Sequence, residues 1–226
     1  MNVRLCITLL FFTPYAVALP PGFVYLKEVA PSIIQDMRYF TANDFMGRPV
    51  AGYQAPACIL TQQAAQALEK VQQQLNKQSM GLKVYDCYRP QMAVDDFITW
   101  SQDIQDQKMK TDYYPRVNKS DFFKLGYVAE KSSHTRGSTA DLTIVRFVGK
   151  SKKPVELAMG THFDFIDESS HPDSDQVSSK AQKNRQLLRQ LMQQAGFSSI
   201  ETEWWHFTLK DEPFPNTYFN FPITKP

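Results

Sequence analysis

The sequence predicts an α+β fold in which helices flank a small, mostly antiparallel sheet. The first observation is the order of the predicted elements: helix, strand, helix, long loop, strand, helix and two short strands, which does not repeat βα units regularly. The second is size, because 226 residues with 42% hydrophobic side chains can bury one sizeable core. The third is that no internal repeat or low-complexity linker divides the chain, so we expect a single domain over residues 19–226.

Two helices and one strand are predicted in the first half of the chain. Apolar residues at helical spacing, such as Leu68 and Val71, predict a helix over residues 61–79, and Gly81 follows as a stop. Residues 82–88 have the pattern of a strand that ends before Pro90. A second helix is expected from residue 92 to about residue 109, with an apolar face formed by Val94, Phe97, Ile98 and Ile104.

The second half is predicted to hold three strands and one helix. Residues 140–148 are rich in β-branched and aromatic side chains and predict a strand. Residues 179–195 predict a helix that Gly196 ends, with Leu187, Leu188, Leu191 and Met192 facing inward. Two short strand-like runs follow at 199–201 and 205–209. The stretch from Lys110 to Ala140 is long for a loop in a compact domain, and such loops usually carry function.

The first 18 residues have the pattern of a secretory signal peptide. Arg4 precedes an apolar run from Leu5 to Phe12, and Ala16-Val17-Ala18 follows as a small-residue cleavage site. An N-terminal strand or a buried helix is the alternative interpretation. The run is too short for a transmembrane helix, which needs about 20 apolar residues. We therefore expect an exported, soluble product that is periplasmic or secreted and has no membrane anchor after cleavage.

Charge and cysteine content exclude several classes of protein. The chain has 25 Lys and Arg against 23 Asp and Glu, and this formal charge of +2 is too balanced for a nucleic-acid binder that relies on a basic field. Three cysteines are too few for a disulfide-stapled small fold or an all-cysteine zinc site. Without the leader, Cys58 and Cys87 remain. They either form a disulfide or lie apart as buried thiols, and separate thiols are the expectation.

Two segments contain candidate metal ligands. His134 and Asp141 stand in the run Ser132 to Asp141, where Gly137 permits the tight bend that can bring them to one ion. His206 lies three residues after Glu203, in Glu-Trp-Trp-His. Two neutral imidazoles and one carboxylate suit zinc and leave a fourth position for water. A nearby glutamate that is not a ligand can take the proton from that water.

Each of these signals is weak alone and has a structural alternative. A histidine and an aspartate seven residues apart are usually surface or structural residues, and tryptophans beside a glutamate are most simply core. Arg89, which follows the predicted strand, can face a carbonyl or carboxylate, or can form an ordinary ion pair. Asp86 is expected to fix Arg89 or a turn. The conjunction of the three segments is what indicates a catalytic metal site.

These residues resemble the zinc D-alanyl-D-alanine dipeptidases, the family that includes the vancomycin-resistance dipeptidase. Ser-Ser-His-Thr-Arg-Gly-Ser at 132–138 together with Glu-Trp-Trp-His at 203–206 is the most specific part of the match. Residues 39–45, 47–53, 159–164 and 211–219 match as well, so the resemblance covers residues 22–222. It implies the zinc fold that these enzymes share with D,D-carboxypeptidases and hedgehog-type domains.

The resemblance also implies the catalytic roles. His134, Asp141 and His206 match the ligands of one Zn²⁺ per chain. Glu203 matches the general base. Arg89 matches the arginine that holds and polarises the carbonyl of the scissile bond.

Four further residues match substrate-binding positions of the family. Ser132 and Tyr53 would meet the carboxylate of the dipeptide, while Tyr39 and Asp164 would lie near its amino group. His162 stands two residues before Asp164, and it is not expected to bind the metal because three ligands suffice for catalytic zinc.

The resulting expectation is an exported zinc enzyme that hydrolyses the small substrate D-Ala-D-Ala to two D-Ala during turnover of cell-wall fragments. Resistance-type members of the family act in the cytosol on newly made dipeptide, whereas a leader would send this chain out of the cytosol. Two alternatives stay open: a D,D-carboxypeptidase that trims peptidoglycan stem peptides, and a non-catalytic binding module on the same zinc scaffold. The sequence leaves the oligomeric state open.

Overall fold

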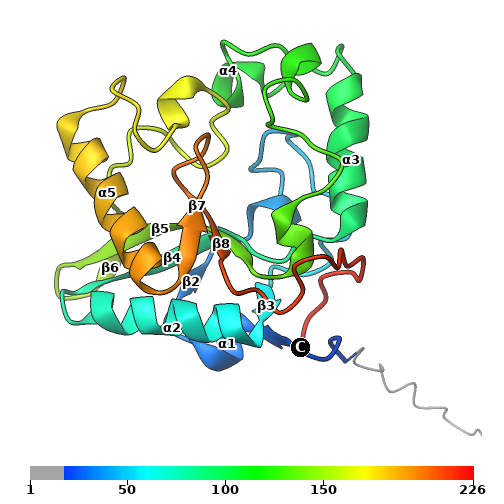
Figure 1. The fold of residues 1–226 in the computed structure, drawn as a ribbon. Helices are drawn as coiled ribbons and strands as arrows, with labels where there is room; N and C mark the ends of the chain where they lie inside the picture. The colour runs from blue at the N-terminus through cyan, green and yellow to red at the C-terminus, as the bar shows by residue number, and fades with distance from the viewer. Residues whose placement is uncertain (1–17) are drawn as a thin grey trace, which may run out of the picture.

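The computed structural model describes residues 18–226, and Figure 1 shows their arrangement. The leader predicted over residues 1–18 lies, apart from Ala18, outside the described residues and stays a prediction. Within the described part of the chain, no helix is both long and apolar enough to span a bilayer. The predicted combination of helices with a mostly antiparallel sheet is confirmed.

A six-stranded sheet forms the centre of the molecule. Its strands follow the order β2-β4-β5-β8-β7, and β6 pairs with the distal end of β5. The β2–β4 pair is parallel, and the pairs that β5 and β8 form with their neighbours are antiparallel. A separate antiparallel ladder joins β1 to β3. The strands are β1 (Phe23–Tyr25), β2 (Ile34–Gln35), β3 (Ile59–Thr61), β4 (Met80–Asp86), β5 (Thr139–Val148), β6 (Lys153–Glu156), β7 (Phe197–Ser199) and β8 (His206–Leu209).

Helices surround this sheet, as Figure 1 shows. Helix α2 packs on β4, α5 packs on β7, and the two helices contact each other, whereas α3 stands on the other side of the sheet. The side chain of Thr61 caps α2 by accepting a hydrogen bond from the Ala64 amide, and Gln72 of α2 accepts one from the Leu82 amide of β4. The helices are α1 (Leu26–Val29), α2 (Gln62–Asn76), α3 (Gln91–Gln102), α4 (Lys110–Tyr113) and α5 (Ser179–Gln194).

Strand β5 aligns the polar residues of the sheet. Its first seven residues are buried, so the sheet is covered on both faces at this point. Because side chains alternate along a strand, Leu142 points away from the face that Asp141 occupies. Asp141 is the register partner of Asp86 in β4 and of His206 in β8. One row across three neighbouring strands therefore carries three polar side chains.

The predicted helix over residues 92–109 is wrong at its carboxyl end. Helix α3 ends at Gln102, and Ile104, expected on the apolar face, is 57% exposed. The Asp103 side chain accepts a hydrogen bond from the Gln105 amide, and Lys119 donates to the Asp103 carbonyl. Such an aspartate turn competes with continuation of the helix, because the aspartate side chain accepts a hydrogen bond from a backbone amide that would otherwise bond a carbonyl of the helix.

The other predicted elements are confirmed to within a few residues, namely α2, β4, β5, α5, β7 and β8. The sequence analysis did not find β1, β2, β3 and β6. These strands have two to four residues, so they are too short to show a period of two. The partners of β1, β2 and β3 also lie far away in the sequence, whereas β6 pairs with the preceding strand β5.

Cys58 and Cys87 form a disulfide, with their Cα atoms 5.3 Å apart, so the expectation of separate thiols is wrong. Cys58 directly precedes β3, and Cys87 directly follows β4. The Tyr88 amide donates a hydrogen bond to the Ile59 carbonyl, which brings these two segments together. The disulfide therefore forms because two distant segments lie side by side, which the spacing of the cysteines in the sequence does not reveal.

Removal of this bridge should destabilise the protein substantially. Because it closes a loop of 29 residues, the variant with both Cys58→Ala and Cys87→Ala should lose about 3–4 kcal/mol of unfolding free energy. Denaturant titrations with and without reductant measure the loss. Reductant should destabilise the wild-type protein and leave the double variant unchanged, and an equal effect on both would contradict the prediction.

Candidate metal-dependent active site

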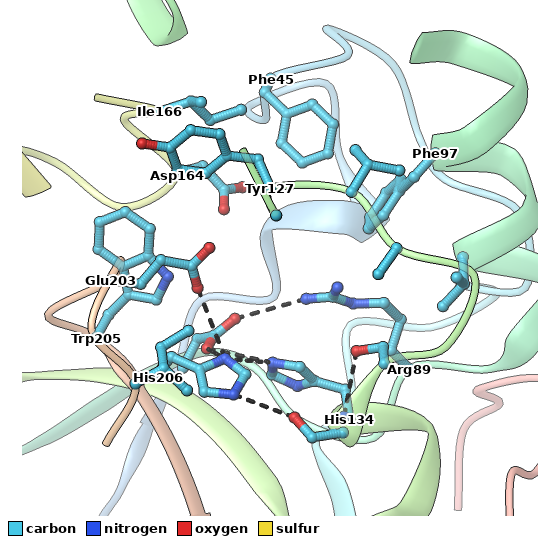
Figure 2. Close-up of a pocket in the computed structure, with 18 of the residues that line it drawn as sticks. Phe45, Arg89, Phe97, Tyr127, His134, Asp164, Ile166, Glu203, Trp205 and His206 are labelled. Carbon is cyan, nitrogen blue, oxygen red and sulfur yellow. Dashed lines mark hydrogen bonds and ion pairs between the residues drawn. The ribbon is translucent and has the colours of Figure 1, made fainter. Parts of the chain in front are cut away.

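A cavity of about 250 Å³ opens beside the row of polar side chains on β4, β5 and β8. Its walls come from the ends of these strands and from the loops at 126–134, 164–166 and 200–205. Figure 2 shows charged side chains on its lower wall and aromatic rings above them. Eight of the nine predicted site residues line this cavity: Tyr39, Arg89, Ser132, His134, Asp141, Asp164, Glu203 and His206.

Three potential metal donors converge on one point of this wall. His134 Nε2 lies 3.3 Å from Asp141 Oδ1, and His206 Nδ1 lies 3.2 Å from the same oxygen. The two imidazole nitrogens are 3.2 Å apart. All three residues are buried. The structure thus brings the three predicted ligands into a nearly equilateral triangle.

Hydrogen bonds on the outer sides of the rings orient the imidazoles. His134 Nδ1 lies 2.7 Å from the carbonyl oxygen of Cys87, which can only accept, so this nitrogen carries the proton and Nε2 carries the lone pair. Ser133 Oγ lies 3.1 Å from His206 Nε2 and can accept from it, which leaves the lone pair on Nδ1. Two lone pairs and a carboxylate oxygen then face one another, an arrangement that a bound cation stabilises.

The dimensions of the triangle fit a metal ion. A tetrahedral ion with bonds of about 2.0–2.1 Å separates its donor atoms by about 3.3–3.4 Å, close to the three distances found here. Within residues 18–226, Asp141 Oδ1 has no hydrogen-bond donor. A buried carboxylate oxygen without a donor is unfavourable unless a cation lies next to it. The chain therefore has a possible metal site made of two imidazoles and one carboxylate.

The ionisation of these groups agrees with metal binding. Burial opposes the charge on Asp141, but positive charge on the imidazoles of His134 and His206 outweighs burial and holds the pKa of its carboxyl well below the usual range. Burial lowers the pKa of His134, which favours its neutral form. Burial alone would lower the pKa of His206 too, yet the attraction of Asp141 and Glu203 raises it. A proton and a metal ion therefore compete for this last nitrogen.

Glu203 lies beside the triangle without being part of it. Its Oε2 atom is 3.6 Å from His206 Nδ1, and its side chain keeps 23% of its surface exposed to the cavity. Burial raises the pKa of the Glu203 carboxyl. Figure 2 shows the carboxylate directed into the cavity between the imidazoles and the aromatic rings. A carboxylate in this position can accept a proton from one group bound in the cavity and donate it to a second bound group.

Arg89 is held rigidly on the opposite side of the triangle. Its Nε atom donates to Asp86 Oδ2 at 2.9 Å, and its guanidinium stacks on the rings of Tyr39 and Phe97, 5.1 and 5.0 Å from their centres. One guanidinium nitrogen lies 3.6 Å from Asp141 Oδ2. The charge is therefore fixed in the cavity wall, where it can stabilise a negative oxygen.

Asp86 fixes Arg89, as expected, and joins it to two other residues. It is fully buried, its Oδ2 atom lies 3.5 Å from His134 Nδ1, and its Oδ1 atom accepts a hydrogen bond of 2.6 Å from the Tyr53 hydroxyl. Tyr53 is the predicted site residue that the structure does not bring to the cavity. Its ring packs on Tyr39, and its hydroxyl approaches Asp86 from behind, so it acts on the site through Asp86.

The remaining predicted substrate residues, Tyr39, Asp164 and Ser132, also line the cavity. Tyr39 donates a hydrogen bond of 3.1 Å to Asp164 Oδ1, and among the described residues Asp164 Oδ2 is buried without a donor. Burial, followed by the charges of Asp141 and Glu203, raises the pKa of Asp164 well above its usual value. Ser132 caps the turn that carries His134 by accepting from the His134 amide at 3.3 Å.

Arg185 of α5 connects the loop that carries Asp164 to the segment that carries Glu203. Its guanidinium donates to the carbonyl oxygens of Met159, Ser169 and His171 at 2.7–2.9 Å. The Trp204 amide in turn donates to the Ser170 carbonyl at 3.0 Å. Two acidic side chains from distant parts of the sequence are therefore placed by one hydrogen-bonded unit.

The sequence analysis did not find two residues of the site. Ser133 hydrogen-bonds His206, one of the three potential metal ligands, and Tyr127 lines the cavity. The only signal for Tyr127 was its place in the long loop between residues 110 and 140. His162, expected to stay away from the metal, has its ring nitrogens next to the carbonyl oxygens of Phe163 and Asp112, and it is not among the donors that converge.

A cation held by the triangle would lie between a carboxylate that can accept a proton and a guanidinium that can hold an oxyanion. Metallopeptidases use this combination to hydrolyse amide bonds. The family model of the D-Ala-D-Ala dipeptidases matches residues 20–224, so the chain belongs to this family of peptidases.

Relatives from several bacteria support this assignment. The chain is 39% identical over 202 residues to a D-alanyl-D-alanine dipeptidase of Enterococcus faecium, and this match covers 89% of the chain and 98% of the relative. It is 40% identical over 201 residues to the dipeptidase of that name from Streptomyces coelicolor, with coverage of 89% and 98%. The Escherichia coli protein of that name is 32% identical over 186 residues, with coverage of 82% and 83%.

The triangle predicts one strongly bound metal ion per chain. Asp141→Ala removes the donor that contacts both imidazoles, so it should weaken zinc binding at least about 100-fold, since even weaker perturbations around a site cost 10–100-fold. Equilibrium dialysis against zinc with elemental analysis measures this. His162→Ala is the matched control and should keep full metal content, whereas loss of metal there or retention in Asp141→Ala would contradict the ligand set.

Proposed function

We propose that this chain is a zinc-dependent D-alanyl-D-alanine dipeptidase. The observation that carries the proposal is the triangle of His134, Asp141 and His206, with Glu203 and Arg89 on either side of it. Family membership and the names of the relatives support D-Ala-D-Ala as the substrate. Zinc is supported by the donor set and by the separations of the three donor atoms. An octahedral ion with similar bonds would hold neighbouring donor atoms about 3.0 Å apart, which is shorter than the 3.2–3.3 Å found here.

The small cavity supports a dipeptide rather than a larger ligand. Its volume of about 250 Å³ lies below the roughly 300–1,000 Å³ of sites that enclose drug-sized ligands. The polar groups are divided between its two ends. Asp164, with one carboxylate oxygen lacking a donor among the described residues, suits an ammonium group, while Ser132 and Arg89 suit oxygen atoms. A free dipeptide presents both kinds of group a short distance apart.

The mechanism assigns one task to each of the two charged residues beside the triangle. Zinc bound there would supply Lewis-acid chemistry that makes water a nucleophile at neutral pH. Glu203 accepts the proton of the attacking water, and Arg89 stabilises the negative charge that grows on the carbonyl oxygen. Glu203 then passes the proton to the leaving amine, which completes hydrolysis to two D-Ala.

The same residues bear on the two alternatives. A non-catalytic binding module needs neither a free carboxylate beside the metal donors nor a guanidinium stacked between two rings. A D,D-carboxypeptidase needs room for the rest of the stem peptide beyond the amino end of the terminal D-Ala-D-Ala. The aromatic and aliphatic side chains above Asp164 restrict this room.

We further propose that the enzyme acts outside the cytosol, on D-Ala-D-Ala released from cell wall. The support for this location is the leader-like pattern of residues 1–18 and the two remaining cysteines, which form a disulfide of the kind that oxidising compartments favour. Such an enzyme would recover D-Ala from wall fragments.

Glu203→Ala should separate catalysis from metal binding. Without the proton acceptor, kcat for D-Ala-D-Ala should fall at least about 100-fold, the lower range of what a general base contributes. Zinc content and thermal stability should stay near wild type, because Glu203 is not among the ligands. Loss of zinc in this variant would show that the ligand assignment is wrong.

The substrate class is tested on zinc-loaded wild-type protein, with a chelated sample as the control. D-Ala-D-Ala should be cleaved, a stem pentapeptide should be cleaved far more slowly, and activity should disappear with chelator and return with zinc. Faster cleavage of the pentapeptide would favour the carboxypeptidase. Stoichiometric zinc with no hydrolysis of any D,D-dipeptide would favour the binding module.

Location is tested by expressing the full chain in a Gram-negative bacterium and fractionating the cells. We expect a protein in the periplasm whose N-terminus is Leu19. Unprocessed protein with residues 1–18 retained in the cytosol would contradict export without affecting the proposed activity.

A further inference from the structure

A second cavity of about 410 Å³ adjoins the catalytic one, and Tyr127 lines both. In Figure 2 the Tyr127 ring extends from its loop above the carboxylates of Asp164 and Glu203, on the side of the site opposite to the imidazoles. Burial, followed by the charges of Asp167, Glu203 and Glu168, raises the pKa of the Tyr127 hydroxyl to about 12. Because Tyr127 lines both cavities, its side chain forms part of the wall that they share.

Contacts with Phe122 of the same loop hold Tyr127 in this position. The Tyr127 and Val128 amides both donate to the carbonyl of Phe122, a residue with no exposed surface. The Phe122 and Tyr127 rings also meet edge to face, with centres 6.2 Å apart. The Tyr127 side chain itself is only half-buried. Its loss should therefore open the wall without removing an element of the core.

The second cavity lies at the amino end of the proposed dipeptide. Asp164 and Ile166 line the catalytic cavity, and the next two residues, Asp167 and Glu168, line the second one. A peptide whose ammonium group met Asp164 would reach the second cavity if it were extended by one residue at that end. Tyr127 stands across this route.

The lining of the second cavity is acidic. Arg116 is engaged by Asp167, with Nε 2.6 Å from Oδ2. Asp121 and Glu168 line the cavity as well, and no ion pair to either carboxylate is formed within residues 18–226. The unbalanced charge favours a cationic side chain over a neutral or acidic one.

We propose that Tyr127 is the specificity-determining wall that limits substrates to two residues, and that the cavity behind it is a latent subsite for a third, cationic residue. The proposal rests on the proposed function, because it takes the amino end of the dipeptide to face Asp164. In a substrate such as Lys-D-Ala-D-Ala, one water is consumed as the C–N bond between the two D-Ala residues breaks. The products are Lys-D-Ala, with a new carboxylate, and D-Ala, whose amine takes the proton.

The experiment compares kcat/KM for D-Ala-D-Ala, Lys-D-Ala-D-Ala and norleucyl-D-Ala-D-Ala, measured as release of C-terminal D-Ala by zinc-loaded protein. In Tyr127→Ala the ratio of lysyl tripeptide to dipeptide should rise at least about 10-fold over wild type, within the range that removal of a steric wall gives. Tyr127→Leu should give an intermediate rise and serves if the alanine variant folds poorly. Zinc content and melting temperature report folding.

Two matched controls separate the wall from general loosening of the loop. Tyr127→Phe keeps the ring and should leave the ratio within about 2-fold of wild type. Phe123→Ala removes an exposed aromatic ring of the same loop that lies outside the lining of both cavities, and it should leave the ratio unchanged. An equal rise in Phe123→Ala, or an unchanged ratio in folded Tyr127→Ala and Tyr127→Leu, would overturn the assignment of Tyr127.

The charge of the subsite has its own test. Tyr127→Ala should prefer the lysyl over the norleucyl tripeptide by about 2- to 5-fold, and adding Glu168→Gln should reduce this preference, as expected for an exposed charge pair. Equal rates for the two tripeptides would overturn the cationic subsite. Failure of the proposed function is distinguishable, because the wild-type protein would then leave D-Ala-D-Ala intact.

Discussion

The strands and loops around the site are organised about three electron-donating atoms held 3.2–3.3 Å apart. Such atoms repel one another unless a cation lies among them, so the fold has to hold each one from outside. The β5–β8 register places Asp141 beside His206, and the Cys87 carbonyl orients His134 from behind. Because Cys87 is also one end of the disulfide, the covalent link and the metal site stabilise the same corner of the sheet.

A second layer behind the triangle explains why residues that do not reach the cavity belong to the site. Asp86 bonds both Arg89 and Tyr53 and approaches His134, so the charge of the guanidinium is fixed relative to the imidazole. In a buried setting an unpaired arginine or aspartate would be costly, whereas this network satisfies both. The family position of Tyr53 thus has a physical basis even though its hydroxyl faces Asp86.

Chemistry and selectivity come from different parts of the fold. Strands β5 and β8 provide Asp141 and His206, and short segments next to the strands provide His134, Arg89 and Glu203. The longer loops provide the walls that decide which peptides fit. Arg185 makes the Asp164 loop and the Glu203 segment one unit, so the acidic end of the cavity has a defined distance from the proton acceptor. The Tyr127 amide bonds the Phe122 carbonyl, while the Tyr127 side chain is only half-buried at the cavity wall, so this is the place where substrate length can change with little effect on the core.

Local patterns were enough to predict the main helices and strands and the type of chemistry, because periodicity and turn residues act locally and the His, Asp and Glu motifs are short. They did not determine the Cys58–Cys87 bridge, the short strands, the end of α3 or the orientation of Tyr53. Those features arise from contacts between distant segments and from the competition between local turns and helices, both of which are resolved when the chain packs.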